Sequence, residues 1–323
     1  MVELALKTQI VLGTVVLEIA VPAVLLLTAG ATRPATRLTW LARTVLVGAY
    51  LAALGVIGQF AVPVPWFAPY AYGLALFAAA LVSLPRCRTH RWGLPPGRAR
   101  RLGLAVTAVS ALVLAAAAGA ALRGYLPPPG PSVNLRFPLD HGLYYVSNAG
   151  ASQLINHHRV TLHDDFRRDY RGQSYGVDIA RVDILGVAAR GFLPDDPAAY
   201  AIFGRPVHAP CTGRITESRD GLPDQRPPRR DLGHPLGNHV MIACKGVVVV
   251  LAHLQKGSVG AHTGEFVRRG QRLARVGNSG ETTSPHLHIH AQRRGTRYAP
   301  LSGKPVSIRF DGRYLVRNSL VWR

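Results

Sequence analysis

The chain has 323 residues, of which 48% are hydrophobic, and it carries a formal net charge of +21. This length is sufficient for a membrane region and a globular domain in one chain. A net positive charge of this size is common in nucleic-acid-binding proteins, but no motif that combines aromatic and basic residues accompanies it. We therefore expect no nucleic-acid partner, and we interpret much of the charge as arginines that flank membrane segments.

Four apolar segments fill the first third of the chain, and each is close to the roughly 20 residues that a bilayer-crossing helix needs. They cover about residues 8–30, 44–62, 68–84 and 102–122. A buried soluble helix is the alternative for any one segment, but four in succession with short connections predict a transmembrane region over residues 1–125. The lead before the first segment is short and Glu3 offsets Lys7, so we expect an anchor rather than a cleaved signal peptide. Such a region requires a lipid bilayer as its partner.

The arginines between the apolar segments predict the orientation of the membrane region. Three lie in the first connection and six in the third, whereas the second connection, around residues 63–67, carries no charge. Because positive loops stay in the cytoplasm, the second connection and everything after Leu122 are expected outside. The Pro-rich residues 126–132 then form a stiff linker. Residues 133–323 follow as a domain on the extracytoplasmic side of a multi-pass cell membrane protein.

Short β-prone segments alternate with turn residues beyond the linker, which predicts a mostly antiparallel β domain. Residues 239–243 and 247–251 are two such segments, and Lys245-Gly246 between them predicts a hairpin turn. The domain also contains Cys211 and Cys244, which form a disulfide if the domain is exported. Two separate buried thiols are the alternative.

Three histidines alternate with apolar residues near the C-terminus, at His286, His288 and His290. In a strand, alternate side chains share a face, so the three imidazoles are expected on one side of a sheet. Neutral imidazole is a common zinc ligand and a general base near neutral pH. The alternative is a histidine-rich solvent face of an amphipathic strand.

Other segments of the domain carry polar residues of the same kind. Asp178 lies between apolar residues in Gly176-Val177-Asp178-Ile179-Ala180, and His253 ends the strand segment 250–254. A glycine-rich stretch, residues 270–280, precedes the three histidines. In this order and spacing, residues of about 144–323 resemble the M23 family of zinc metallopeptidases, the lysostaphin/LytM-like domains. The last three segments carry most of that resemblance.

The resemblance implies a fold, a cofactor and roles for four residues. Asp178 and His288 would bind Zn²⁺, while His253 and His286 would assist the attacking water and the transition state. Bound zinc lowers the pKa of its water toward neutrality and polarises a scissile carbonyl. Three protein ligands leave the fourth position for that water. The family's substrates are peptides of bacterial cell-wall peptidoglycan.

One position departs from the family pattern, which has a histidine four residues before the acid. Here that position is Ser174, and serine is a poor zinc ligand. The missing ligand is expected from an upstream segment, with His158 preferred over His157 and His163. The prediction is therefore a membrane-anchored zinc endopeptidase that hydrolyses peptide bonds of peptidoglycan. The alternative is a catalytically inactive LytM-like module that binds the wall or regulates a partner, and a transporter with an accessory exported domain is a third, weaker alternative.

Overall fold

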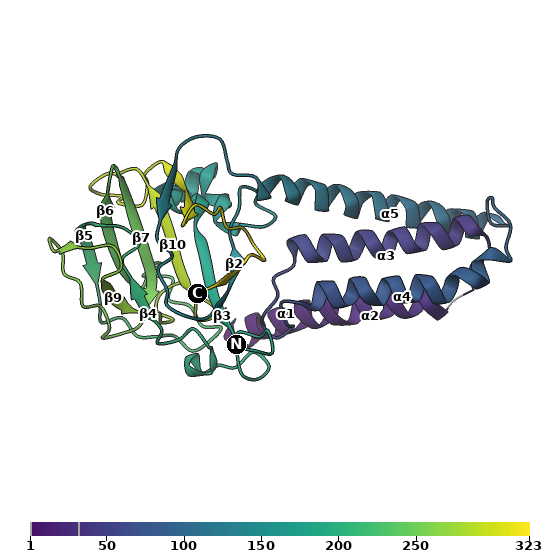
Figure 1. The fold of residues 1–323 in the computed structure, drawn as a ribbon, viewed down its shortest axis with the longest axis horizontal. Coiled ribbons are helices and arrows are strands. Elements are labelled where there is room, and N and C mark those ends of the chain that lie inside the picture. The colour runs from purple at the N-terminus through teal and green to yellow at the C-terminus, as the bar shows by residue number, and fades with distance from the viewer. Residues whose placement is uncertain (1, 32) are drawn as a thin grey trace. The chain divides into compact units, whose positions relative to one another are not determined.

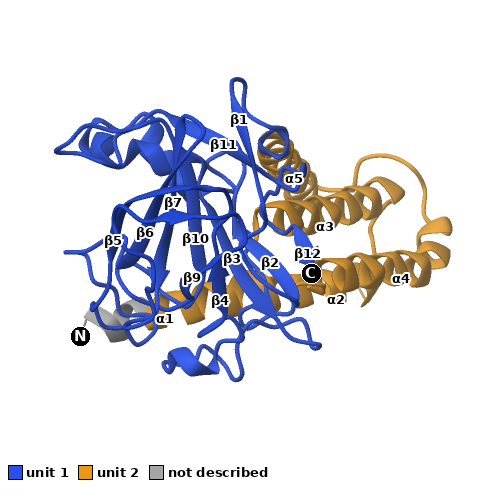
Figure 2. Cartoon of the chain, turned by 60° about the vertical axis from the view of Figure 1, so that its left-hand side comes forward, with its two compact units in different colours: residues 1–4, 59–65, 123–323 blue, residues 5–58, 66–122 orange. Residues whose placement is uncertain are grey.

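A computed structural model describes residues 2–31 and 33–323, with side chains from residue 7 onward. The chain divides into two compact units (Figure 2). The helical unit consists of residues 5–58 and 66–122. The sheet unit consists mainly of residues 59–65 and 123–323. The loop 59–65, between two helices, therefore belongs to the sheet unit.

Four long apolar helical segments make up the first part of the chain, as the sequence predicts (Figure 1). The first is continuous through α1 (Val2–Thr14), the π-helical segment η1 (Val15–Ala20) and α2 (Val21–Ala31). The others are α3 (Arg37–Ile57), α4 (Ala68–Arg88) and α5 (Arg98–Leu122). α3 begins before the apolar segment 44–62 and ends at Ile57, because the stretch before Pro63 and Pro65 leaves the helix. Large apolar side chains such as Leu74 and Leu112 are exposed, which suits helices that face lipid.

A single acidic side chain lies inside the first candidate span, Lys7–Ala31. This residue, Glu18, is in the π-helical segment η1 and is 9% exposed. The hydroxyl of Tyr50 donates to the Leu17 carbonyl at 2.5 Å, and that of Tyr72 donates to the Glu18 carbonyl at 2.6 Å. An ionisable residue inside a span is typical of a functional position.

A ten-stranded sheet forms the centre of the sheet unit and is mostly antiparallel, as predicted. Its main order is β12-β2-β3-β10-β7-β6-β5-β8, and β11 joins β10 and pairs in parallel with β1. A separate pair is formed by β4 and β9. The strands are β1 (Ser132–Leu135), β2 (Leu143–Asn148), β3 (Val177–Val182), β4 (Pro206–His208), β5 (Gly213–Arg219), β6 (Asn238–Cys244), β7 (Val247–Leu254), β8 (Phe266–Val267), β9 (Arg272–Arg275), β10 (Leu287–Gln292), β11 (Pro305–Phe310) and β12 (Leu320–Trp322).

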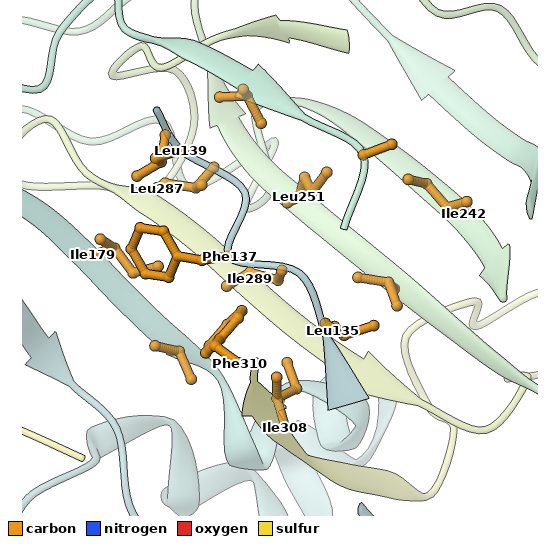
Figure 3. Close-up of a cluster of buried hydrophobic side chains, with 14 of the residues drawn as sticks. Leu135, Phe137, Leu139, Ile179, Ile242, Leu251, Leu287, Ile289, Ile308 and Phe310 are labelled. Carbon is orange, nitrogen blue, oxygen red and sulfur yellow. The ribbon is translucent and has the colours of Figure 1, made fainter. Parts of the chain in front are cut away.

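The apolar core lies against one face of the central strands (Figure 3). Leu287 and Ile289 of β10 point into it together with Ile179 of β3 and Leu251 of β7, and all four are fully buried. Burial of one such side chain stabilises the fold by about 1.5–3 kcal/mol. Because side chains alternate across a strand, the intervening residues of β3 and β10 point to the opposite face.

The predicted hairpin and the cysteine pair belong to the same sheet. β6 and β7 pair antiparallel, and Lys245 and Gly246 both have positive φ angles of 35° and 83° in the turn between them. Such angles are required by the tight turns that suit twisted hairpins. Cys211 and Cys244 form a disulfide with a Cα–Cα distance of 6.2 Å, which joins the end of β6 to the segment before β5.

Candidate active site

Two neighbouring strands place an acid and an imidazole directly opposite each other. Asp178 of β3 is the register partner of His288 of β10, and His288 also pairs with Ala252 of β7. His288 Nδ1 lies 2.8 Å from Asp178 Oδ1. Both side chains are buried, so this polar pair is held in the low-dielectric centre of the sheet.

A second imidazole reaches Asp178 from a segment that is distant in the sequence. His158 lies in the 3-10 helix η3 (His157–Leu162), and its Nε2 is 3.0 Å from Asp178 Oδ2. Asn156 caps this helix, because its side-chain oxygen accepts from the His158 N–H at 3.2 Å. The Asn156 amide also donates to the carbonyls of Gly150 and Gly176, which fixes the helix start beside β3.

His157 is the other upstream histidine near the carboxylate. Ligand atoms of His157, His158 and Asp178 all lie within 4.8 Å of one another. The ring of His157 is 4.6 Å from that of His158, measured between centroids, but His157 is exposed. His163 is also exposed, beyond the end of η3. The contact with Asp178 therefore favours His158.

Ser174 is fully buried, in the 3-10 helix η4 (Asp165–Tyr175), and its hydroxyl takes part in a different network. The hydroxyl donates to the Arg171 carbonyl at 2.6 Å and lies 2.9 Å from the Thr161 hydroxyl. Thr161 in turn donates to the His158 carbonyl at 2.8 Å. Ser174 therefore supports the helix that carries His158.

Gly176 leaves the space into which two of the rings fit. A Cβ added there would lie 2.7 Å from His288 Cε1 and 3.1 Å from His158 Cδ2. The φ angle of Gly176 is −58°, so the requirement is for room rather than for an unusual backbone conformation. A side chain at this position would push both imidazoles away from Asp178.

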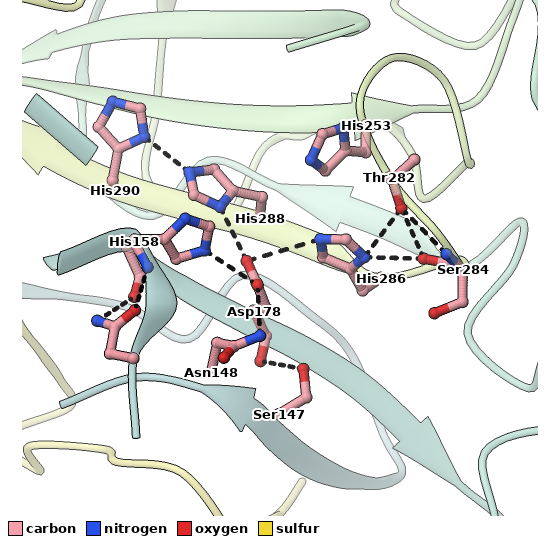
Figure 4. Close-up of polar contacts among 12 residues, drawn as sticks. Ser147, Asn148, His158, Asp178, His253, Thr282, Ser284, His286, His288 and His290 are labelled. Carbon is pink, nitrogen blue, oxygen red and sulfur yellow. Dashed lines mark hydrogen bonds and ion pairs between the residues drawn. The ribbon is translucent and has the colours of Figure 1, made fainter. Parts of the chain in front are cut away.

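His286 and His253 lie on the other side of Asp178 and His288 (Figure 4). His286 Nε2 is 3.6 Å from Asp178 Oδ1, while its Nδ1 is 2.8 Å from the Ser284 carbonyl. The ring of His253 is 4.9 Å from that of His286. Each of these rings thus has one nitrogen directed at a backbone carbonyl, and His253 Nδ1 is 2.9 Å from the Ser279 carbonyl.

A β-bulge aims His253 at the site. The register between β6 and β7 shifts between Asn238 and Val240, and His253 has a φ angle of 60°. A bulge re-aims side chains, and a non-glycine residue at positive φ is strained unless its surroundings hold it. Here the His253 N–H donates to the Leu236 carbonyl and the His253 carbonyl accepts from Gly277 N–H, at 3.0 and 2.9 Å.

His290 also shares the polar face, but it lies behind His288. Its Nδ1 is 2.9 Å from His288 Nε2, and both rings are buried. Its Nε2 is buried without a hydrogen-bond partner among the residues whose side chains the structure describes. His290 therefore orients His288 rather than facing Asp178, and the alternative of a histidine-rich solvent face is wrong.

Burial and charge set the protonation of the cluster. Burial alone would raise the pKa of Asp178, but the charges of His158 and His286 and hydrogen bonds from His158 and His288 hold it well below its usual value. Desolvation lowers the pKa of His288 to about 4 and that of His253 well below its usual value. The site therefore presents the Asp178 carboxylate beside the neutral imidazoles of His288 and His253, and these are the forms that bind a metal.

The sequence reasoning missed the residues that support these groups. Asn148 of β2 donates to Asp178 Oδ2 at 3.1 Å, and Arg317 donates to the Asn148 side-chain oxygen at 2.6 Å. Asn156 and Thr161 act on His158 as described above. None of these residues belongs to a spaced motif, so only their meeting in three dimensions identifies them.

The remaining paired histidines of the domain have structural partners elsewhere. His208 lies 3.4 Å from Asp140, His234 lies 2.9 Å from Asp231, and His239 lies 3.2 Å from Glu217. The cluster around Asp178 is therefore distinct: two imidazoles on one carboxylate with two more imidazoles beside them. This donor set is typical of metal-dependent hydrolases.

The model of Peptidase family M23 matches residues 198–300. The chain therefore contains an M23 peptidase domain, and the family resemblance of the sequence is confirmed. The matched segment includes His253, His286 and His288. Asp178 and His158 lie before it, and the sheet register and η3 are what bring them to the matched histidines.

Solved structures of peptidases are similar to parts of the chain. A zinc-containing peptidase from Vibrio cholerae is 25% identical, with 38% of this chain and 27% of that chain covered and a TM-score of 0.22. The catalytic domain of lysostaphin from Staphylococcus simulans is 20% identical, with 39% and 71% covered and a TM-score of 0.26. A putative M23 peptidase from Pseudomonas aeruginosa is 19% identical, with 55% and 53% covered and a TM-score of 0.27.

The chain thus spans about a quarter of the length of the Vibrio cholerae peptidase. Because all three TM-scores are low, the assignment to the peptidase class rests on the family match. No curated protein sequence matches the chain.

Proposed function

We propose that the protein is a membrane-anchored zinc endopeptidase that hydrolyses peptide bonds of bacterial cell-wall peptidoglycan. The observation that supports this most is that one carboxylate meets two imidazoles from separate elements. His158 Nε2 of η3 and His288 Nδ1 of β10 lie 3.0 and 2.8 Å from the carboxylate oxygens of Asp178 in β3. Two imidazoles and one carboxylate suit Zn²⁺ and leave a coordination position for water. The donors present therefore fit the cofactor that the family implies.

When bound, zinc would supply an acidic water and polarise the scissile carbonyl. In the proposed mechanism the protein's own residues bind the metal, orient its ligands and move protons. Asp178 and the rings of His158 and His288 would hold the metal, while Asn148 fixes the carboxylate through its 3.1 Å hydrogen bond. His290 fixes the tautomer and tilt of His288.

His286 and His253 are the proposed acid–base pair. Each has its Nδ1 directed at a backbone carbonyl, which favours the tautomer with the proton on Nδ1 and leaves Nε2 as the basic nitrogen of the neutral ring. A neutral imidazole with a free Nε2 can take a proton from the attacking water and later give it to the leaving amine. The 3.6 Å separation of His286 Nε2 from Asp178 Oδ1 places that nitrogen at the edge of the proposed metal site.

The substrate class and location are proposed from the family and the chain's organisation. Four candidate spans precede the domain, and the arginine distribution favours an extracytoplasmic domain. The Cys211–Cys244 disulfide supports the same location, since disulfides persist in oxidising compartments. A domain on that side can meet cell-wall peptides.

The rival proposal is a wall-binding or regulatory module without activity. Ser174 at the family's first ligand position favours it, and the approach of His158 to Asp178 argues against it. The two proposals differ in whether the site loads metal and cuts.

Zinc content and cell-wall lysis of the purified full chain test the proposal. We expect His288→Ala and His158→Ala to lose both zinc and lysis, since each removes a proposed ligand. His234→Ala, whose histidine pairs with Asp231, should keep both. Full lysis by the His288→Ala variant would overturn the proposal. If His157→Ala or His163→Ala loses zinc while His158→Ala keeps it, the upstream ligand is wrongly assigned.

A further inference from the structure

A tight turn after β3 presents large apolar side chains to solvent. The carboxylate of Asp183 accepts hydrogen bonds from the N–H groups of Leu185 and Val187 at 2.9 and 3.1 Å, which fixes the turn. Ile184 is 99% exposed and Leu185 is 68% exposed at its tip. Phe192, in the loop that follows, is 52% exposed. A rigid turn that holds such side chains in water is unfavourable unless something covers them.

Arginines surround a pocket beside the same turn. The pocket has a volume of about 490 Å³, and its lining includes Arg181, Arg190, Arg205 and Arg275 but one carboxylate, that of Asp183. Asp183 is already engaged by the turn. Arg181 Nε is buried and has no hydrogen-bond partner among the side chains that the structure describes. Guanidinium groups gathered in this way suit an anionic group such as a phosphate.

The pocket wall is hydrogen-bonded to the loop that joins α3 and α4. The N–H of Ala188, which lines the pocket, donates to the Ala61 carbonyl at 2.7 Å. A second bond holds the same loop, from the Phe60 N–H to the Tyr145 hydroxyl at 3.0 Å. Phe60, Ala61 and Val64 are all buried. The loop follows directly on one candidate span and precedes another, so chain connectivity keeps it close to a membrane surface.

We propose that Ile184, Leu185, Phe192 and the arginine-lined pocket form a membrane-docking surface of the peptidase domain. In this arrangement the apolar side chains enter the bilayer boundary, and the arginines bind the phosphodiester groups of anionic lipids. The exposed apolar tips favour lipid over a wall polymer, because a hydrated sugar–phosphate chain would leave them in water.

The membrane depth of a spin label in the full chain tests this surface without reference to peptidase activity. The label is attached to Ile184→Cys in a Cys87→Ala background, with the Cys211–Cys244 disulfide left intact, in vesicles that contain phosphatidylglycerol. We expect collisions with oxygen to exceed those with a water-soluble nickel chelate. Tyr298→Cys is the matched control, since Tyr298 is 93% exposed on a different loop, and its label should show the reverse preference.

The charge requirement is tested by adding Arg190→Gln and Arg205→Gln to the Ile184→Cys chain. We expect these changes to remove the preference for oxygen. Equal access of the nickel chelate to the labels at positions 184 and 298 would overturn the docking surface. An unchanged preference in the double arginine variant would overturn the role of the arginines.

Two additions separate the lipid headgroup from other sources of phosphate. Replacing chloride by inorganic phosphate at equal ionic strength should leave the label at position 184 in its lipid environment. If phosphate releases it, the pocket is a site for the free anion and the lipid assignment is wrong. Release by purified cell-wall fragments would likewise assign the surface to the wall and overturn the proposal.

Discussion

At the scale of single residues, Ser174 stands where the family pattern has a histidine. It occupies the position four residues before Asp178, and its hydroxyl donates to the Arg171 carbonyl and lies 2.9 Å from the Thr161 hydroxyl. Thr161 holds the carbonyl of His158, whose ring contacts Asp178. The position that would supply a ligand in the family pattern thus supports the helix that carries His158, the proposed replacement ligand.

This arrangement predicts that Ser174→Ala weakens metal binding without removing a ligand. The change leaves the Thr161 hydroxyl with one fewer partner and loosens the start of η3. Because supporting residues of this kind typically change metal affinity by about 10–100-fold, we expect zinc to bind at least about 10-fold more weakly. The measurement is competition for zinc against a chelator of known affinity.

Ser258→Ala is the control for that measurement, since the Ser258 hydroxyl bonds the Gln255 carbonyl away from the site. It should bind zinc as the unchanged chain does. Equal affinity in both serine variants would show that Ser174 does not support the site.

The sequence predicts those site residues that lie in spaced motifs. His286, His288, His253 and Asp178 stand in strand segments whose alternation and order are visible in one dimension, and the structure brings all four together. Asn148, Thr161 and the role of His290 were not predictable in this way. Their contacts depend on how η3, β2 and β10 pack, and each is a common polar residue in an ordinary local context.

At the scale of elements, β10 contributes to both the apolar core and the polar cluster of the sheet unit. One face contributes Leu287 and Ile289 to the core, and the other contributes His288 and His290 to the polar cluster. β3 lies on one side and β7 on the other, so the register of three strands sets the site. A slip of one residue would turn the histidines into the core.

The close approach of η3 to β10 predicts a strong effect of Gly176→Ala. The added methyl group would lie 2.7 Å from His288 Cε1, so either the ring or the backbone must move. Overpacking of this kind costs about 1–3 kcal/mol. We expect a large loss of bound zinc while the circular dichroism of the sheet is retained.

Gly233→Ala is the matched change, because its nearest atom would be Asp231 Oδ1 at an ordinary 3.4 Å. It should leave the zinc content unchanged. Normal zinc stoichiometry and affinity in Gly176→Ala would mean that the rings do not need the space beside this glycine.

The sequence also predicts most elements but not all of their connections. Four apolar helices and the β6–β7 hairpin follow from length, hydropathy and turn residues. The parallel pairing of β1 with β11 was not predictable, because the two strands lie far apart in the chain. The 3-10 helices η3 and η4 contain few apolar residues, and they were not predicted as elements.

At the scale of the whole molecule, a disulfide joins two segments of the sheet unit that are distant in the sequence. The Cys211–Cys244 disulfide has a sequence separation of 33 and joins the segment before β5 to the end of β6. The bond restricts the conformations of the unfolded chain. In the chain-entropy model, closing a loop of this size stabilises the folded state by about 3–4 kcal/mol.

We therefore predict that the domain is less stable without this disulfide. For the full chain with Cys211→Ser and Cys244→Ser, we expect the free energy of unfolding to fall by about 3 kcal/mol. The fall would be measured as a lower urea midpoint of the near-ultraviolet circular dichroism signal. Cys87→Ala, which leaves the disulfide in place, should shift the midpoint much less. Identical midpoints for the double serine variant and the unchanged chain would contradict a stabilising role of the bond.

The pairing of β1 with β11 limits how far the peptidase domain can reach. The Pro-rich linker leads directly into β1, which is fixed in the sheet, and the loop 59–65 holds the same unit at Tyr145 and Ala188. A domain of this size is roughly 40 Å across. With both tethers short, the proposed function has a consequence for access: the domain would stay within about its own width of the membrane that the candidate spans would cross, so only wall peptides in that layer would be within its reach.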